Sequence, residues 1–231
     1  SDTLRYYMIG GAKAGVDINY NFDDIKVKNR NLVVLWNVHN YVINYAKEID
    51  VNPLELDVNI LENSSLEEKY ILSKLDSTIQ KVTELFEVYK IEEIPMHIEN
   101  LYLELSRTYI QLIRDKAALG SEDEKKLVLY VMYNVLFETL KMFSTVAPFI
   151  TEKMYLNFKD AFGLEKESIH HYDWPDVEVG SINETLEDNF EIVKMVIQSA
   201  LAAREKAKLG LRWPIGELVV ETSSDTVNQA V

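Results

Sequence analysis

Long segments of helical apolar spacing constrain the fold of this chain most. Within them apolar side chains recur every three or four residues, which places them on one face of an α-helix. Glycine and proline, the residues that most often interrupt helices, number only 8 and 5 among 231 residues. Such helices must bury their apolar faces against one another, so we predict an all-α helical bundle. The long segments are residues 23–49, 65–89, 95–120, 121–143 and 181–210, and a shorter one is 151–162.

The predicted helix ends carry recognisable capping residues. A Ser-x-x-Glu capping box satisfies two backbone N–H groups at a helix start. It occurs three times, as Ser65 with Glu68, Ser121 with Glu124 and Ser181 with Glu184. Pro95 also suits a helix start, whereas Pro148 is expected to end or kink a helix, with the next one starting at Thr151.

The segments divide into three parts. We predict a connector over residues 1–22, the bundle over residues 23–213 and the start of a further domain or tail over residues 214–231. The connector holds a short helix from about Asp2 to Ile9 and then a loop. The short apolar run Leu218–Val220 predicts the start of a strand and a small β-containing segment at the C-terminus.

The sequence lacks the signatures of a catalytic site. There is no glycine-rich phosphate loop and no Gly-x-Ser-x-Gly turn, and the absence of cysteine excludes thiol nucleophiles, thiolate metal sites and disulfides. The adjacent histidines His170 and His171 point in different directions, so no metal site is expected. No apolar run approaches the length of a membrane span, so we expect no membrane partner. The sequence favours binding over catalysis.

Charge is distributed unevenly along the chain. The formal net charge of −14 argues against a polyanion as partner, since phosphate neutralisation requires Lys and Arg. Residues 47–100 carry 13 acids and 5 bases, a local charge of −8. Residues 194–212 carry five bases and one acid, a local charge of +4. A nucleic-acid-binding face must therefore be local.

Several segments resemble class I aminoacyl-tRNA synthetases, in the order in which that family has them. Residues 1–10 (SDTLRYYMIG) resemble the stretch after the family's catalytic Lys-Met-Ser-Lys-Ser loop, and Phe22 to Trp36-Asn37 resembles the entry into the anticodon-binding bundle. Residues 105–116 (LSRTYIQLIRDK) resemble the family's Leu-Ser-x-Trp-Tyr…Arg segment, with Thr108 where the family usually has Trp. Ala147-Pro148-Phe149 with Thr151-Glu152 and Tyr155 resembles a segment shared by the isoleucine, valine and leucine enzymes.

Two further segments resemble the isoleucine members of this family. One is Ser168-Ile169-His170 with Asp173-Trp174-Pro175, and the other is Ala203-Arg204 with Lys206-Ala207 and Leu211-Arg212-Trp213-Pro214. The resemblance covers roughly residues 1–220 and implies an anticodon-binding region without the catalytic core. It implies a cytoplasmic ligase whose partners are isoleucine tRNA, through its anticodon stem-loop, and the catalytic domain of the same chain, with no DNA partner. ATP and magnesium are implied for the whole enzyme and no cofactor for this chain, which should be inactive alone.

Eleven residues are candidates for tRNA contact. The leading cluster lies in the locally basic segment, although favourable charge at a helix C-terminus would also explain it. Tyr109 could stack on an unpaired base but is better explained as a core residue. Arg107 and Arg114, seven residues apart, would share a helix face that is either RNA-binding or simply solvated. The candidates are Arg204, Lys206, Lys208 and Arg212, then Arg107, Tyr109, Arg114 and Lys116, and finally Lys26, Lys28 and Arg30.

Two alternatives stay open at this stage. The chain could be the corresponding region of a valine enzyme, with the same role. It could instead be a helical protein-interaction module without RNA binding, which the net charge of −14 would favour. Salt-dependent tRNA binding separates these classes.

Overall fold

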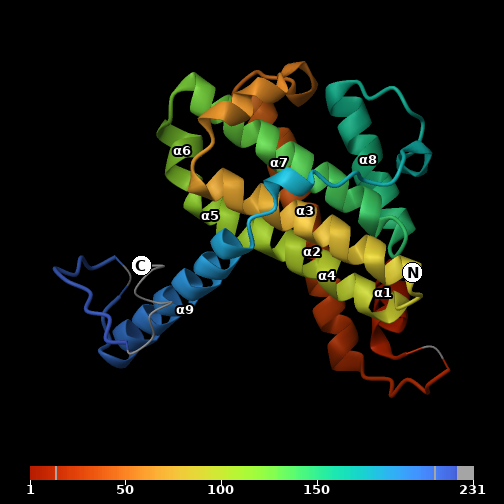
Figure 1. The fold of residues 1–231 in the computed structure, drawn as a ribbon, viewed down its shortest axis with the longest axis horizontal. Helices are drawn as coiled ribbons and strands as arrows, with labels where there is room; N and C mark the ends of the chain where they lie inside the picture. The colour runs from red at the N-terminus through yellow and green to blue at the C-terminus, as the bar shows by residue number, and fades with distance from the viewer. Residues whose placement is uncertain (14, 211, 223–231) are drawn as a thin grey trace. The chain divides into compact units, whose positions relative to one another are not determined.

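A computed structural model of the chain describes residues 1–13, 15–210 and 212–222. These residues fold mainly into helices and contain no strand, which confirms the predicted all-α class (Figure 1). Their contacts form two compact units, Ser1–Ile182 and a second that begins at Asn183. The helices are α1 (Asp2–Gly11), α2 (Phe22–Glu48), α3 (Leu66–Glu87), α4 (Ile94–Glu104), α5 (Ile110–Leu112), α6 (Arg114–Leu119), α7 (Glu122–Phe143), α8 (Pro148–Phe162) and α9 (Glu184–Lys206).

Helix α7 is the centre of the first unit. It packs against α2, α3, α4, α6 and α8, so it is buried on several sides rather than along one stripe. Its side chains Val128, Leu136 and Phe143 are fully buried. Aromatic rings extend this core, with Tyr6 of α1 edge-on to Phe143 at a centroid distance of 5.2 Å. Burial of this extent is the main stabilising term of a helical bundle.

Two of the three predicted capping boxes are confirmed. The backbone N–H of Ser65 donates to Glu68 at 2.9 Å, and that of Ser121 donates to Glu124 at 2.7 Å. The box predicted at Ser181 is wrong, because Asn183 caps α9 by accepting from the backbone N–H of Leu186 at 3.0 Å. The Ser181 hydroxyl donates instead to the carboxylate of Asp76 on α3, a partner that sequence spacing does not reveal.

The helix predicted over residues 95–120 is interrupted. After α4, Leu105–Tyr109 form a π-helical turn, and α5 and α6 follow with a break at Ile113. A π turn fits one extra residue into a helical turn, so it rotates every later side chain relative to a regular α-helix. Tyr109 and Ile113 still reach the core, at 0% and 1% exposure. The interruption changes the direction in which the side chains between Tyr109 and Ile113 point.

Other helix ends differ by a few residues from prediction. Helix α8 starts at Pro148 rather than Thr151, since proline fits the first turn, where its missing N–H is no loss. Helix α8 ends at residue 162, as predicted, and Gly163 follows it in the left-handed region at φ 81°. Helix α2 starts after Asn21 instead of Asp23 or Asp24. Short 3₁₀ turns occupy the connectors at Pro53–Glu55, Val58–Asn63, Ile91–Glu93, Ile169–His171 and Val179–Ser181.

The second unit contains α9 and the chain that follows it. Helix α9 ends at Lys206, short of the predicted Gly210. The strand predicted at Leu218–Val220 is absent from the described part of the chain, which supplies no neighbouring strand to pair with these residues. They line an apolar groove of about 360 Å³ with the α9 side chains Ile192, Met195 and Val196. Residues 223–231, the remainder of the predicted C-terminal segment, lie outside the described residues.

Candidate nucleic-acid interface

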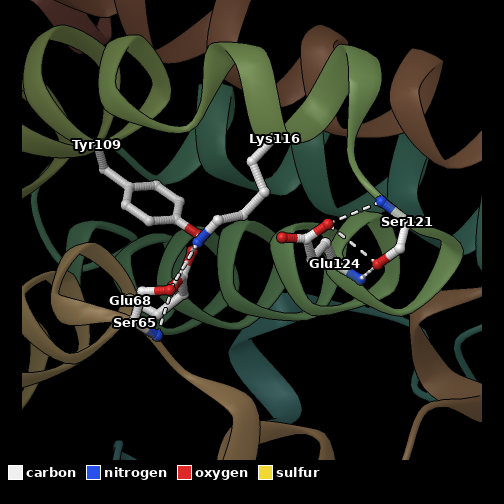
Figure 2. A network of polar contacts seen from close by, with 6 residues as sticks. All are labelled: Ser65, Glu68, Tyr109, Lys116, Ser121 and Glu124. Carbon is white, nitrogen blue, oxygen red and sulfur yellow. Dashed lines mark hydrogen bonds and ion pairs between the residues drawn. The ribbon is translucent and has the colours of Figure 1, made fainter.

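Lys116 and Tyr109 belong to a buried polar network (Figure 2). The Lys116 ammonium lies 2.9 and 3.0 Å from the two carboxylate oxygens of Glu68, whose side chain is fully buried, and 3.1 Å from the Ser65 hydroxyl. The Tyr109 hydroxyl donates to the same carboxylate at 3.4 Å. Glu68 thus closes the capping box of α3 and compensates a lysine from α6. Both candidates are held inside the first unit, and the ring of Tyr109 is not accessible to a base.

Lys28 is also engaged within the protein. Its ammonium lies 2.8 Å from Glu99 of α4 and 4.6 Å from the centre of the Tyr6 ring. Burial lowers the pKa of Lys28. Its neighbours on α2 differ, since Lys26 is exposed in an ion pair with Asp23 at 2.9 Å and Arg30 is exposed. Lys28 therefore joins α2 to α4, and only Lys26 and Arg30 remain accessible.

Arg107 and Arg114 are both exposed. The prediction that they share one helix face assumed an unbroken α-helix. The π turn at Leu105–Tyr109 and the break at Ile113 remove that assumption, so a spacing of seven residues no longer equals two α-helical turns. Both guanidinium groups remain accessible to a ligand, but the seven-residue spacing no longer places them on one helix face.

The basic end of α9 separates into one structural and three accessible cations. The Arg204 guanidinium donates to the backbone carbonyls of Gly210 and Trp213, the latter at 2.7 Å, and so closes the turn after the helix. Lys208 lies in that turn with a positive φ of 56°. Lys206, Lys208 and Arg212 are exposed, and so is Trp213, at 70%. Cations also stabilise a helix C-terminus, but Lys208 and Arg212 lie beyond the end of α9.

Sequence reasoning missed the uncharged polar side chains of α2. Asn37 and Asn44 are exposed and Tyr41 is half-buried, at spacings that put all three on one side of the helix. The signal that could have identified them is the absence of acidic residues from this part of α2. Among the described residues, no group of His, Asp or Glu side chains is arranged to hold a metal ion. Within the same ranges, no helix combines the length and apolar character of a membrane span.

Comparison with known proteins decides the family. The family described as the anticodon-binding domain of tRNA ligase matches residues 68–221. This chain belongs to that family. The match includes the Glu68 network, the π turn and the basic end of α9, but it begins after α2.

Curated relatives extend the similarity along the whole chain. Isoleucine–tRNA ligase of Methanopyrus kandleri is 32% identical over 224 residues, 96% of this chain and 21% of the relative. Isoleucine–tRNA ligase of Pyrococcus furiosus is 31% identical over 233 residues, 100% of this chain and 22% of the relative. That of Methanosarcina acetivorans is 32% identical over 235 residues, again 100% and 22%. The chain spans about a fifth of the length of these isoleucine–tRNA ligases.

A solved structure shares the fold. It is a chain of the ternary complex of Agrobacterium radiobacter K84 agnB2 LeuRS with tRNA and LeuAMS, with a TM-score of 0.58 and 15% sequence identity. The similarity covers 79% of this chain and 20% of that one. The helical bundle is therefore an arrangement already seen within a larger synthetase chain.

Proposed function

We propose that this chain is the anticodon-binding domain of an isoleucine–tRNA ligase and binds the anticodon stem-loop of isoleucine tRNA. The observation that carries the proposal is the basic end of α9, where Lys206, Lys208 and Arg212 are exposed in a chain with a net charge of −14. Phosphate contact requires exposed cations, and this segment carries five bases against one acid. The names of the curated relatives support isoleucine as the amino acid.

The domain contributes recognition and orientation of the tRNA, while the catalytic domain of the same polypeptide performs the chemistry with ATP and magnesium. This chain does not fit those cofactors. It has no glycine-rich phosphate loop, and its described residues hold no cluster of metal-binding side chains. The role implies a cytoplasmic protein without a DNA or membrane partner.

The proposal predicts that this chain alone makes no aminoacyl-adenylate. A catalytic core elsewhere in the polypeptide is needed for isoleucine-dependent pyrophosphate exchange. The measurement is that exchange with the purified chain, against the complete ligase as positive control. Exchange by the chain alone would contradict the assignment of its role.

The identity of the tRNA is tested with the complete ligase. Its affinity for isoleucine tRNA should exceed that for valine tRNA, and both should weaken with salt as counterions return to the phosphates. Preference for valine tRNA would favour the valine enzyme. Absence of salt-dependent binding to any tRNA would favour a protein-interaction module and overturn the proposal.

A further inference from the structure

The segment from Trp174 to Ser181, which we call the strap, is the last part of the first unit before α9. The first unit ends at Ile182, and α9 begins two residues later, at Glu184. Apart from the 3₁₀ turn at Val179–Ser181, the strap has no regular secondary structure. Few backbone hydrogen bonds of its own therefore fix it, and its position depends on side-chain contacts with the bundle.

The start of the strap is attached to α3 through Trp174. The indole N–H donates to the Thr83 hydroxyl at 2.8 Å, and the ring lies edge-on to Phe86 at a centroid distance of 5.3 Å. The Thr83 hydroxyl donates in turn to the carbonyl of Ile79 at 2.7 Å. Pro175, the next residue of the strap, is buried. The Trp-Pro pair, part of a segment that resembles the isoleucine enzymes, therefore fixes the start of the strap on α3.

The end of the strap is attached to α3 through one buried carboxylate. Asp76 is 7% exposed, and it accepts from the backbone N–H of Glu178 at 3.1 Å and from the hydroxyl of Ser181. Asp76 lies seven residues before Thr83, which is about two helical turns, so both attachment points are on one side of α3. A buried carboxylate is costly unless hydrogen bonds compensate it, and the strap supplies two of these donors.

This second attachment point is close to the start of α9. Ser181 precedes Glu184 by three residues, which span at most about 10 Å. The lysines to which the proposed function assigns phosphate contact, Lys206 and Lys208, lie at the other end of the same helix and just after it. A binding group that is held before the ligand arrives loses less conformational entropy on binding. Release of the strap should therefore weaken tRNA binding even though no contact with the RNA is removed.

We propose that Asp76 is a positioning residue for tRNA binding, because its carboxylate fixes the strap to α3 and so limits the movement of α9. The inference rests on the proposed function, since it requires α9 to bind tRNA. Asp76 lies in the acidic stretch of residues 47–100, where a negative charge by itself repels phosphates. Charge alone predicts that removal of Asp76 improves binding, whereas the positioning role predicts that it weakens binding.

The test uses the complete ligase and measures Kd for isoleucine tRNA, KM for tRNA and kcat in aminoacylation, and isoleucine-dependent pyrophosphate exchange. Asp76→Ala should raise Kd and KM roughly five- to tenfold, since two hydrogen bonds to a carboxylate are lost. The kcat at saturating tRNA and the pyrophosphate exchange should not change. Asp76→Asn should keep most of the affinity, because a carboxamide oxygen can still accept from both donors. The matched control is Glu87→Ala, which removes an exposed acid from the same helix and should not raise Kd.

Ser181→Ala tests the same attachment from the strap. It removes one of the two donors and should raise Kd about two- to threefold. Its combination with Asp76→Ala should add little, because both changes act through one attachment point. Amide hydrogen exchange at Glu178 should become faster in Asp76→Ala, with exchange in α7 unchanged.

The outcomes separate this inference from the proposed function. If the wild type binds no tRNA, both are overturned. If the wild type binds tRNA but Asp76→Ala binds it as tightly or more tightly, only the positioning role is overturned. A parallel fall in pyrophosphate exchange would indicate general damage to the enzyme and would also overturn that role. Should Asp76→Ala fail to fold, Ser181→Ala, which keeps the carboxylate, decides the question, and a wild-type Kd for it would contradict the proposal.

Discussion

Lysines serve opposite purposes in two regions of this molecule. In the first unit, the Lys116 ammonium faces the buried carboxylate of Glu68 at 2.9 Å. In the second, Lys206 and Lys208 are exposed, and no ion pair engages either of them among the described residues. A lysine that faces a buried acid contributes to folding, whereas one that faces water is free to meet a ligand. Burial and the opposing group, rather than position along a helix, decide which role a cation has.

The largest expected effect comes from Lys116→Met. Removal of the ammonium leaves the Glu68 carboxylate buried without its compensating charge, which costs about 3–5 kcal/mol of unfolding free energy. Urea denaturation of the variant measures this loss. The double variant Lys116→Met with Glu68→Gln should recover much of it, since glutamine removes the uncompensated charge and can still close the capping box of α3. A loss below about 1 kcal/mol for Lys116→Met would show that the network is not structural.

A second prediction extends the comparison to a buried histidine. His39 is fully buried, with ring centroids 5.2 Å from Trp36 and 5.1 Å from Phe158. Burial lowers its pKa from 6.5 to about 4. Between pH 6.5 and about pH 4 the imidazole of His39 is protonated in the unfolded chain but not in the folded chain. The unfolding free energy is therefore at its full value above pH 6.5 and falls as the pH drops toward 4.

The contribution of His39 over that interval is about 3 kcal/mol. His39→Leu should remove this part of the acid sensitivity, because the side chain no longer titrates. The unfolding free energy of both proteins is measured from about pH 7 to about pH 4, a range that spans the ordinary and the lowered pKa of His39, and gives the two slopes. Identical slopes would exclude His39 as the source of acid sensitivity.

Arg204→Met tests the one cation of the basic end that is held by protein groups. Its loss frees the carbonyls of Gly210 and Trp213, so the turn after α9 should loosen by about 1 kcal/mol. Amide hydrogen exchange at Lys208 to Trp213 should become faster, with exchange in α7 unchanged. Lys206→Met is the matched control from the same turn of helix and should leave this exchange as it is.

The sequence predicts helices well where local chemistry decides them. The boxes at Ser65 and Ser121 are local, because each residue finds its partner three positions away. The box at Ser181 fails because Asp76, far away in sequence, takes its hydroxyl. The π turn at Leu105–Tyr109 also has no local signature in the sequence, and the residues Tyr109 and Ile113 are buried despite it.

The candidate site was less predictable than the fold. Composition identified the basic end of α9, because a local excess of bases needs no knowledge of neighbours. It did not distinguish Lys116, Lys28 and Arg204, which are engaged by partners 48, 71 and 6 residues away, from cations that are free. It also overlooked the uncharged polar side chains Asn37, Tyr41 and Asn44 of α2, which no excess of bases marks in the sequence.

The most direct test of the account is the salt dependence of tRNA binding by Lys206→Ala with Lys208→Ala. Exposed lysines contribute little to folding, so the change in unfolding free energy should stay within about 0.5 kcal/mol. In the complete ligase, the slope of log Kd against log salt should flatten by about 1.5–2 for two lost phosphate contacts, and binding should weaken. Glu67→Ala, a change at a half-buried residue of the acidic segment, should leave the slope unchanged. A double variant with wild-type affinity and wild-type slope would contradict the assignment of this surface to tRNA.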